Sequence, residues 1–170
     1  MVSLAEAIRG GLSLGNVPRY MLAQFFGAVA GVWIAHIMFG EPVIQFSQHV
    51  RSGSALLVSE LVATFGLLLV IFGVARNRSE AVPYAVGAYI TGAYWFTAST
   101  SFANPAVTLA RTLTNTFSGI RPADAPGFIA FQIFGAAAAI GFFRWLSPAL
   151  PKTNEPVCVN QRQARGAHVR

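Results

Sequence analysis

Asn104, Pro105 and Ala106 are the residues whose types and spacing point most directly to chemistry. They follow a run without charged residues that begins at Ala81, and the run is longer than the roughly 20 residues a helix needs to cross a bilayer. Asn is a favoured N-cap and Pro is favoured at the first helical position, so a short helix is predicted to begin at Pro105. A helix that restarts at membrane depth is tolerated only where protein buries it or a watery cavity adjoins it. We therefore expect a re-entrant half-helix whose start faces a lumen.

The Asn104 amide sets the chemistry expected at this start. Its oxygen can accept a hydrogen bond from a half-helix N–H, which leaves its NH2 group free to donate into the lumen. A helix N-terminus also carries partial positive charge, so the site would orient water or hydroxyl solutes and repel protons and cations. The alternative interpretation is an ordinary surface turn that begins with Pro.

Four further polar residues lie within the apolar segments or near their ends. Glu60 is expected to face the bundle interior and to accept hydrogen bonds from backbone N–H groups between Ser99 and Phe102, with a proton relay as the alternative. Gln24 and Gln132 are expected to hydrogen-bond between helices. His36, near the end of a segment, is expected to be packed or interfacial rather than a gate.

Composition identifies the elements that must position these residues. The chain has 170 residues, of which 54% are hydrophobic and 11% charged, far fewer charged residues than the roughly 25% of soluble domains. An all-α membrane protein of one domain is therefore predicted. The net charge of +6 does not indicate a nucleic-acid partner, because the basic residues lie between apolar runs and in the tail.

The apolar segments predict four spanning helices, at about Pro18 to Phe39, Ser54 to Ala75, Val82 to Phe96, and Ala125 to Phe143. Val2 to Gly11 is too short and too polar to span. Residues 1–150 would form the membrane domain, and residues 151–170 a basic, disordered, cytoplasmic tail. Cys158 and His168 in that tail are too isolated to indicate a metal site.

The basic residues predict the orientation. Nine fall on one side of the membrane if the spans alternate, namely Arg9, Arg19, Arg76, Arg78, Arg144, Lys152, Arg162, Arg165 and Arg170. Three fall on the other side, namely Arg51, Arg111 and Arg121. The positive-inside rule then gives a multi-pass protein of the cell (inner) membrane with a cytoplasmic C-terminus.

An internal repeat relates the two ends of the chain. Residues 2–6 (VSLAE) are similar to residues 107–111 (VTLAR), and residues 23–28 (AQFFGA) are similar to residues 131–136 (FQIFGA). The two copies would enter from opposite faces, which is an inverted repeat. Two spans precede the half-helix in the second copy. By symmetry, two spans and an Asn-Pro pair would precede the first, and Met1 occupies the position that corresponds to Ala106.

These motifs resemble the aquaporin and aquaglyceroporin family, the major intrinsic proteins. Asn104-Pro105-Ala106 resembles the second signature of the family, and residues 59–66 (SELVATFG) resemble its fourth helix, whose buried acid braces the re-entrant loop. The resemblance implies an inverted-repeat bundle with two half-helices, here without the first two of six helices. It also implies homotetramers in which each subunit holds a pore.

The resemblance places an outer selectivity constriction at Gly92, Ser101 and Val107. Water-selective relatives carry His at the first position and Arg at the last, so this constriction should be wider and less polar. The Asn-Pro-Ala-Val pattern resembles bacterial members linked to arsenic resistance. Glycerol and neutral metalloid hydroxides such as arsenous acid are then the expected cargo. The alternative is that Val107 packs and the pore is closed.

Arg111 lies one helical turn beyond Val107 and is expected either to restore positive charge at the pore mouth or to be a solvated helix end. A passive channel for small uncharged solutes, with lipid and solute as its partners, is the favoured function. The alternative is a non-conducting truncated fragment that only packs with other channel subunits. A secondary transporter is disfavoured by the single intramembrane acid, and an enzyme by the lack of a phosphate loop or paired carboxylates. No cofactor is expected.

Overall fold

The computed structural model describes residues 1–146, and all regular elements among them are helices. The predicted tail, residues 151–170, lies outside the described residues. In chain order the elements are α1 (Val2–Arg9), η1 (Leu14–Asn16), α2 (Val17–Phe39), α3 (Ser54–Ala75), η2 (Ser79–Ala81), α4 (Val82–Phe96), α5 (Pro105–Ala110), η3 (Arg111–Leu113) and α6 (Ala125–Leu146).

The helix positions agree with those predicted from the apolar runs, and the membrane fold class is confirmed. Three helices in the described part are long and apolar enough to cross a membrane, and they contain α2, α3 and α6. The fourth expected span is α4, which has 15 residues. At 1.5 Å per residue α4 is about 22 Å long, less than the roughly 30 Å hydrocarbon core. The four spanning helices expected from the sequence thus correspond to three long helices and the shorter α4, whose bounds are those predicted.

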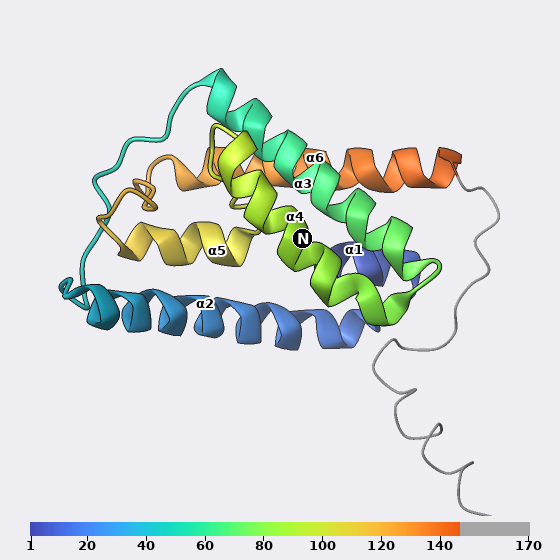
Figure 1. The fold of residues 1–170 in the computed structure, drawn as a ribbon, viewed down its shortest axis with the longest axis horizontal. Coiled ribbons are helices and arrows are strands. Elements are labelled where there is room, and N and C mark those ends of the chain that lie inside the picture. The colour runs from blue at the N-terminus through green and yellow to red at the C-terminus, as the bar shows by residue number, and fades with distance from the viewer. Residues whose placement is uncertain (147–170) are drawn as a thin grey trace, which may run out of the picture.

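Helices α3 and α6 form the closely packed pair at the centre of the bundle (Figure 1). A methyl group built on Gly135 of α6 would lie 2.5 Å from the backbone oxygen of Leu61 on α3, so glycine is what lets the two helices approach. Further along the pair, the rings of Phe72 and Phe143 meet edge to face at 5.4 Å. Helix α1 docks on this pair through Arg9, whose guanidinium carbon lies 4.1 Å from the centre of the Phe72 ring.

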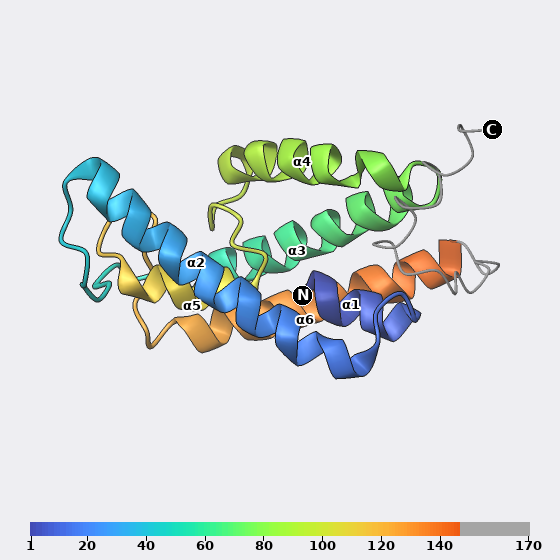
Figure 2. The same cartoon turned by 90° about the horizontal axis from the view of Figure 1, so that it is seen from below.

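The two short helices α1 and α5 begin near the middle of the molecule and run in opposite directions (Figures 1 and 2). Their contacts repeat in the same way. Gln24 of α2 donates to Ser3 Oγ of α1 at 2.8 Å, and Gln132 of α6 donates to Thr108 Oγ1 of α5 at 2.9 Å. Ser3 and Thr108 occupy equivalent positions in the sequence repeat, as do the two glutamines. The inverted repeat is therefore confirmed at the level of hydrogen bonds.

The repeat is broken at one face of α2. Only 11% of the most apolar part of this helix is buried, against 44% for α3 and 33% for α6. Gly27 of α2 is the repeat equivalent of Gly135, yet apart from the neighbouring backbone of α2 itself no described atom lies within 4 Å of a methyl group built on Gly27. The face of α2 that corresponds to the α3-binding face of α6 is thus open in the described structure.

Candidate functional site

The loop between α4 and α5 has an unusual backbone. Thr100, Ser101 and Ala103 all have positive φ angles, of 61°, 49° and 49°, although none is glycine. Left-handed backbone at such residues costs on the order of 1–3 kcal/mol each and persists only where the surroundings enforce it. The contacts that enforce it in this loop therefore define the candidate site.

Glu60 supplies the central support of this loop from within α3. Its side chain is completely buried, and its two carboxylate oxygens each accept a backbone N–H, from Phe102 at 2.9 Å and from Ala103 at 2.9 Å. Gln132 of α6 donates to the same carboxylate at 2.7 Å. The two backbone donors lie at and just beyond the end of the range Ser99 to Phe102 considered from the sequence. The acid thus joins the loop to α3 and α6.

Asn104 begins α5 with extended backbone, and its side-chain oxygen accepts the N–H of Ala106 at 3.0 Å. Pro105 occupies the first helical position, where it requires no N–H partner. The Asn104 NH2 group donates to Gln24 Oε1 at 3.3 Å. One of its two N–H groups is thus directed at Gln24, so the amide links α5 to α2 as well as capping α5.

The three expected constriction residues have different surroundings. Ser101 is 5% exposed, and its hydroxyl has no hydrogen-bond partner among the described residues. Val107 is partly buried and packs against the apolar cluster of Phe102, Ile120 and Phe128. Gly92 is exposed on α4, where an added methyl group would meet only the ring of Phe96 on the same helix. Ser101 and Val107 therefore flank Phe102, and Gly92 stands apart on another helix.

Arg51 is the main residue of the site that the sequence did not single out. It lies between α2 and α3, is 5% exposed, and donates to three backbone carbonyl groups. These are Gly119 (2.7 Å), Ser99 (3.0 Å) and Phe117 (2.7 Å). Burial lowers the pKa of Arg51 from its usual value, but an arginine remains protonated at physiological pH. Arg51 therefore joins the strained loop, through the Ser99 carbonyl, to the loop that carries Phe117 and Gly119. In the sequence Arg51 is one of several basic residues in loops. No neighbouring residue indicates that its side chain contacts distant carbonyl groups.

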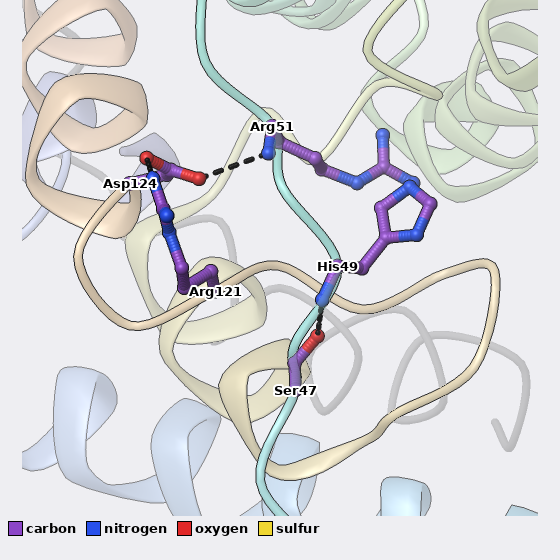
Figure 3. A network of polar contacts seen from close by, with 5 residues as sticks. All are labelled: Ser47, His49, Arg51, Arg121 and Asp124. Carbon is purple, nitrogen blue, oxygen red and sulfur yellow. Dashed lines mark hydrogen bonds and ion pairs between the residues drawn. The ribbon is translucent and has the colours of Figure 1, made fainter.

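The segment that carries Arg51 runs beside the loop that follows η3 (Figure 3). His49 accepts the backbone N–H of Arg121 at 2.7 Å, and Ser47 donates its backbone N–H to Thr112 at 2.8 Å. Figure 3 shows the backbone N–H of Arg51 directed at Asp124, at 2.9 Å, while its side chain extends to the other side. Asp124 also accepts from Arg121 at 2.9 Å. These bonds hold Arg51 in place.

Asp124 gives this loop pair a dependence on pH. The hydrogen bond from Arg121 lowers the pKa of the Asp124 carboxyl below its usual value. Burial opposes this effect, and the Arg51 N–H and the charge of Arg121 lower the pKa further. A lowered folded-state pKa stabilises the fold above the unfolded value of about 4, and the contribution is lost as the pH falls through the lowered folded pKa. The loop pair should therefore loosen only in acid.

Asp124→Asn tests this expectation. Peptides around residues 48–53 and 119–125 should exchange backbone hydrogens faster in the variant than in the unchanged protein at pH 7. The difference should narrow as the pH falls below about 4 and should disappear below the lowered folded pKa, where the carboxyl is protonated in the folded unchanged protein as well. Each comparison is made at a single pH, so intrinsic exchange rates cancel. A difference that persists undiminished in strong acid would contradict the assignment.

His36 is buried, at 3% exposed, near the C-terminal end of α2. Its ring nitrogens lie 3.1 Å from the carbonyl oxygen of Val43 and 2.8 Å from Thr114 Oγ1. It is therefore packed between α2 and the loops that carry Val43 and Thr114, which is one of the alternatives given by the sequence.

Comparison with known families decides the family. The sequence model of the Major intrinsic protein family matches residues 1–97, more than half of the chain. The chain belongs to this family. The match ends before Asn104, so the family assignment does not depend on the Asn-Pro-Ala signature.

Individual relatives agree with this assignment. The chain is 54% identical to Aquaglyceroporin AqpS of Rhizobium meliloti over 151 residues. This match covers 88% of this chain and 65% of AqpS. The chain is 39% identical over 94 residues to Aquaporin NIP1-1 of Zea mays (52% of this chain, 33% of that protein). It is 31% identical over 105 residues to the Glycerol uptake facilitator protein of Streptococcus pneumoniae (54% of this chain, 45% of that protein). The chain thus spans at most about two thirds of the length of these relatives. No solved structure matches the chain.

Proposed function

We propose that the chain forms a passive transmembrane channel for small uncharged solutes, with water and glycerol as the first candidates. The observation that carries this proposal is the start of α5 in the middle of the bundle, preceded by strained backbone that Glu60 holds. Irregular backbone at membrane depth is found where it is buried in protein or lines a water-filled cavity. Helix starts of this kind are recurrent parts of pores.

The solute class follows from the relatives and from the constriction. Two of the relatives are named for glycerol or as an aquaglyceroporin, which supports a solute larger than water. Val107 adds no donor and packs against apolar side chains, and Gly92 adds no side chain. We extend the proposal to arsenous acid, an uncharged trihydroxy solute of similar hydrogen-bonding pattern.

The proposal includes the placement of the chain. The asymmetry of the basic residues supports an inner-membrane protein with a cytoplasmic C-terminus. The family resemblance supports a homotetramer. The pore-facing roles proposed for Asn104, Pro105 and Ala106 rest on the position of α5.

Flux measured by light scattering in proteoliposomes tests the channel. Vesicles that contain the chain should take up glycerol faster than empty vesicles, and should release it faster when the gradient is reversed. Asn104→Asp keeps an oxygen that can cap Ala106 but removes the NH2 donor, so glycerol uptake should fall by about fivefold, the effect of roughly 1 kcal/mol on a barrier. The exposed change Asn77→Asp is the matched control. Uptake no faster than in empty vesicles would refute the channel for this chain.

A second candidate is favoured by the open face of α2. A subunit that packs with another channel subunit through this face would bury Gly27 and the exposed side chains around it. Small residues such as Gly27 and Gly31 allow membrane helices to approach closely. Two differently tagged copies of the chain should then purify together from mild detergent. Their separation into monomers would refute this candidate.

A further inference from the structure

Arg111 is a cation beside the strained loop with one buried donor atom that is not used within the described part of the chain. It is the first residue of η3, directly after α5, and is only partly exposed. Its guanidinium carbon lies 4.2 Å from the centre of the Phe102 ring. Its Nη1 atom is buried and has no hydrogen-bond partner among the described residues. A buried guanidinium nitrogen without an acceptor is costly, so an acceptor is expected from outside the chain.

Arg51 provides the contrast, because it contacts the same ring. Its guanidinium carbon lies 5.1 Å from the centre of Phe102, yet each of its three nitrogens already donates to a backbone carbonyl. Arg51 is therefore a positioning residue. Burial lowers the pKa of Arg111, the neighbouring Arg51 lowers it further, and Tyr94 and Glu60 act in the opposite direction. Of the two cations on this ring, Arg111 has the buried donor that the protein leaves unused.

Unpartnered polar atoms belong both to the strained loop and to Arg111, which contacts Phe102 of that loop. Six buried side-chain nitrogen or oxygen atoms in the described part of the chain lack a hydrogen-bond partner, and three of them lie between residues 100 and 111. These are Thr100 Oγ1, Ser101 Oγ and Arg111 Nη1. Ser101 directly precedes Phe102, on whose ring Arg111 rests. Hydroxyl groups both donate and accept, whereas a guanidinium only donates.

We infer that Arg111 is the solute-binding and specificity-determining donor at the outer end of α5, one helical turn beyond the expected position 107. Arg111 donates to a hydroxyl oxygen of an uncharged solute. Arg51 holds the adjoining loop between α4 and α5 through the Ser99 carbonyl. This inference rests on the proposed function. The polar residue of the constriction is then Arg111. It is not residue 107, because Val107 has no polar group and packs against apolar side chains.

Arginine-selective modification tests the binding without requiring flux. The full chain in liposomes is treated with phenylglyoxal, in glycerol or in sucrose of equal osmolarity, and the modified peptides are quantified by mass spectrometry. Glycerol at about twice its Kd should slow the modification of Arg111 about threefold, since bound solute protects in proportion to occupancy. Arg121, which is 43% exposed and paired with Asp124, is the internal reference and should be unaffected. Equal Arg111 rates in glycerol and sucrose would overturn the inference.

Flux ratios form the second arm. Arg111→Leu should change the glycerol-to-water permeability ratio about fivefold or more, corresponding to roughly 1 kcal/mol of lost differential interaction. Arg111→Lys, which keeps a donor, should retain part of the ratio, and Arg78→Leu, a change of an exposed arginine between α3 and η2, should leave it unchanged. An unchanged ratio in Arg111→Leu would overturn the inference while the channel proposal stands. If the unchanged chain conducts nothing, the channel proposal fails, and the protection of Arg111 by glycerol still decides whether it binds solute.

Discussion

Glu60→Ala is expected to destabilise the chain more than any other single change of a polar residue. It leaves the buried N–H groups of Phe102 and Ala103 without an acceptor, and each unsatisfied donor costs about 1–3 kcal/mol. The loop also loses the support that holds its left-handed residues. We expect the free energy of unfolding to fall by about 2–6 kcal/mol. Thermal unfolding in detergent, followed by circular dichroism, measures the loss.

Glu60→Gln separates the two roles considered for this acid. Glutamine keeps one acceptor oxygen, but in either orientation its NH2 group would face a donor: the N–H of Phe102 in one, and the N–H of Ala103 together with the amide of Gln132 in the other. The variant should therefore lose a substantial part of the stability lost by Glu60→Ala. A proton relay would instead predict a normally stable variant with altered proton flux. Glu80→Gln, an exposed acid on η2, is the matched control and should unfold as the unchanged chain does.

The helices could be predicted from the sequence because their signals are local. The apolar runs are bounded by charged residues, glycine and proline, and the resulting ranges agree with α2, α3 and α6. The start of α5 was equally local, since an Asn-Pro pair both caps and initiates a helix. The internal repeat supplied the long-range information, because equivalent residues make equivalent contacts.

The parts that could not be predicted depend on where side chains meet across the fold. Arg51 reaches Ser99, Phe117 and Gly119, which are 48 to 68 positions away, through a loop without a regular pattern. Whether the Val107 side chain faces a pore or packs against protein could not be predicted. Its spacing from Asn104 gives its position along the helix, but not its contact with the cluster of Phe102, Ile120 and Phe128. Family position alone would have assigned the constriction to residue 107. We propose Arg111 instead, because it contacts the Phe102 ring and its Nη1 atom has no partner among the described residues.

The repeat-related glycines Gly135 and Gly27 provide a matched pair for the second prediction. Alanine favours a helix over glycine by about 1 kcal/mol, so this gain is the same at both positions and any difference is steric. At Gly135 the new methyl group would lie 2.5 Å from the Leu61 carbonyl oxygen and 3.2 Å from its carbonyl carbon and Cα atom. These are backbone atoms and cannot rotate away, so α3 and α6 must separate.

Gly135→Ala is therefore expected to destabilise the chain by about 1–3 kcal/mol, the usual cost of overpacking. The separation also strains the 2.7 Å bond between Gln132, one turn earlier on α6, and Glu60, next to Leu61. Gly27→Ala should leave the unfolding temperature of the monomer unchanged or slightly raised. Apart from the neighbouring backbone of α2, no described atom lies within 4 Å of a methyl group built at Gly27. If Gly27→Ala instead weakens the pairing of tagged copies while the monomer unfolds normally, the open face of α2 is an assembly surface. Equal destabilisation of the monomer at both positions would contradict the packing described for α2.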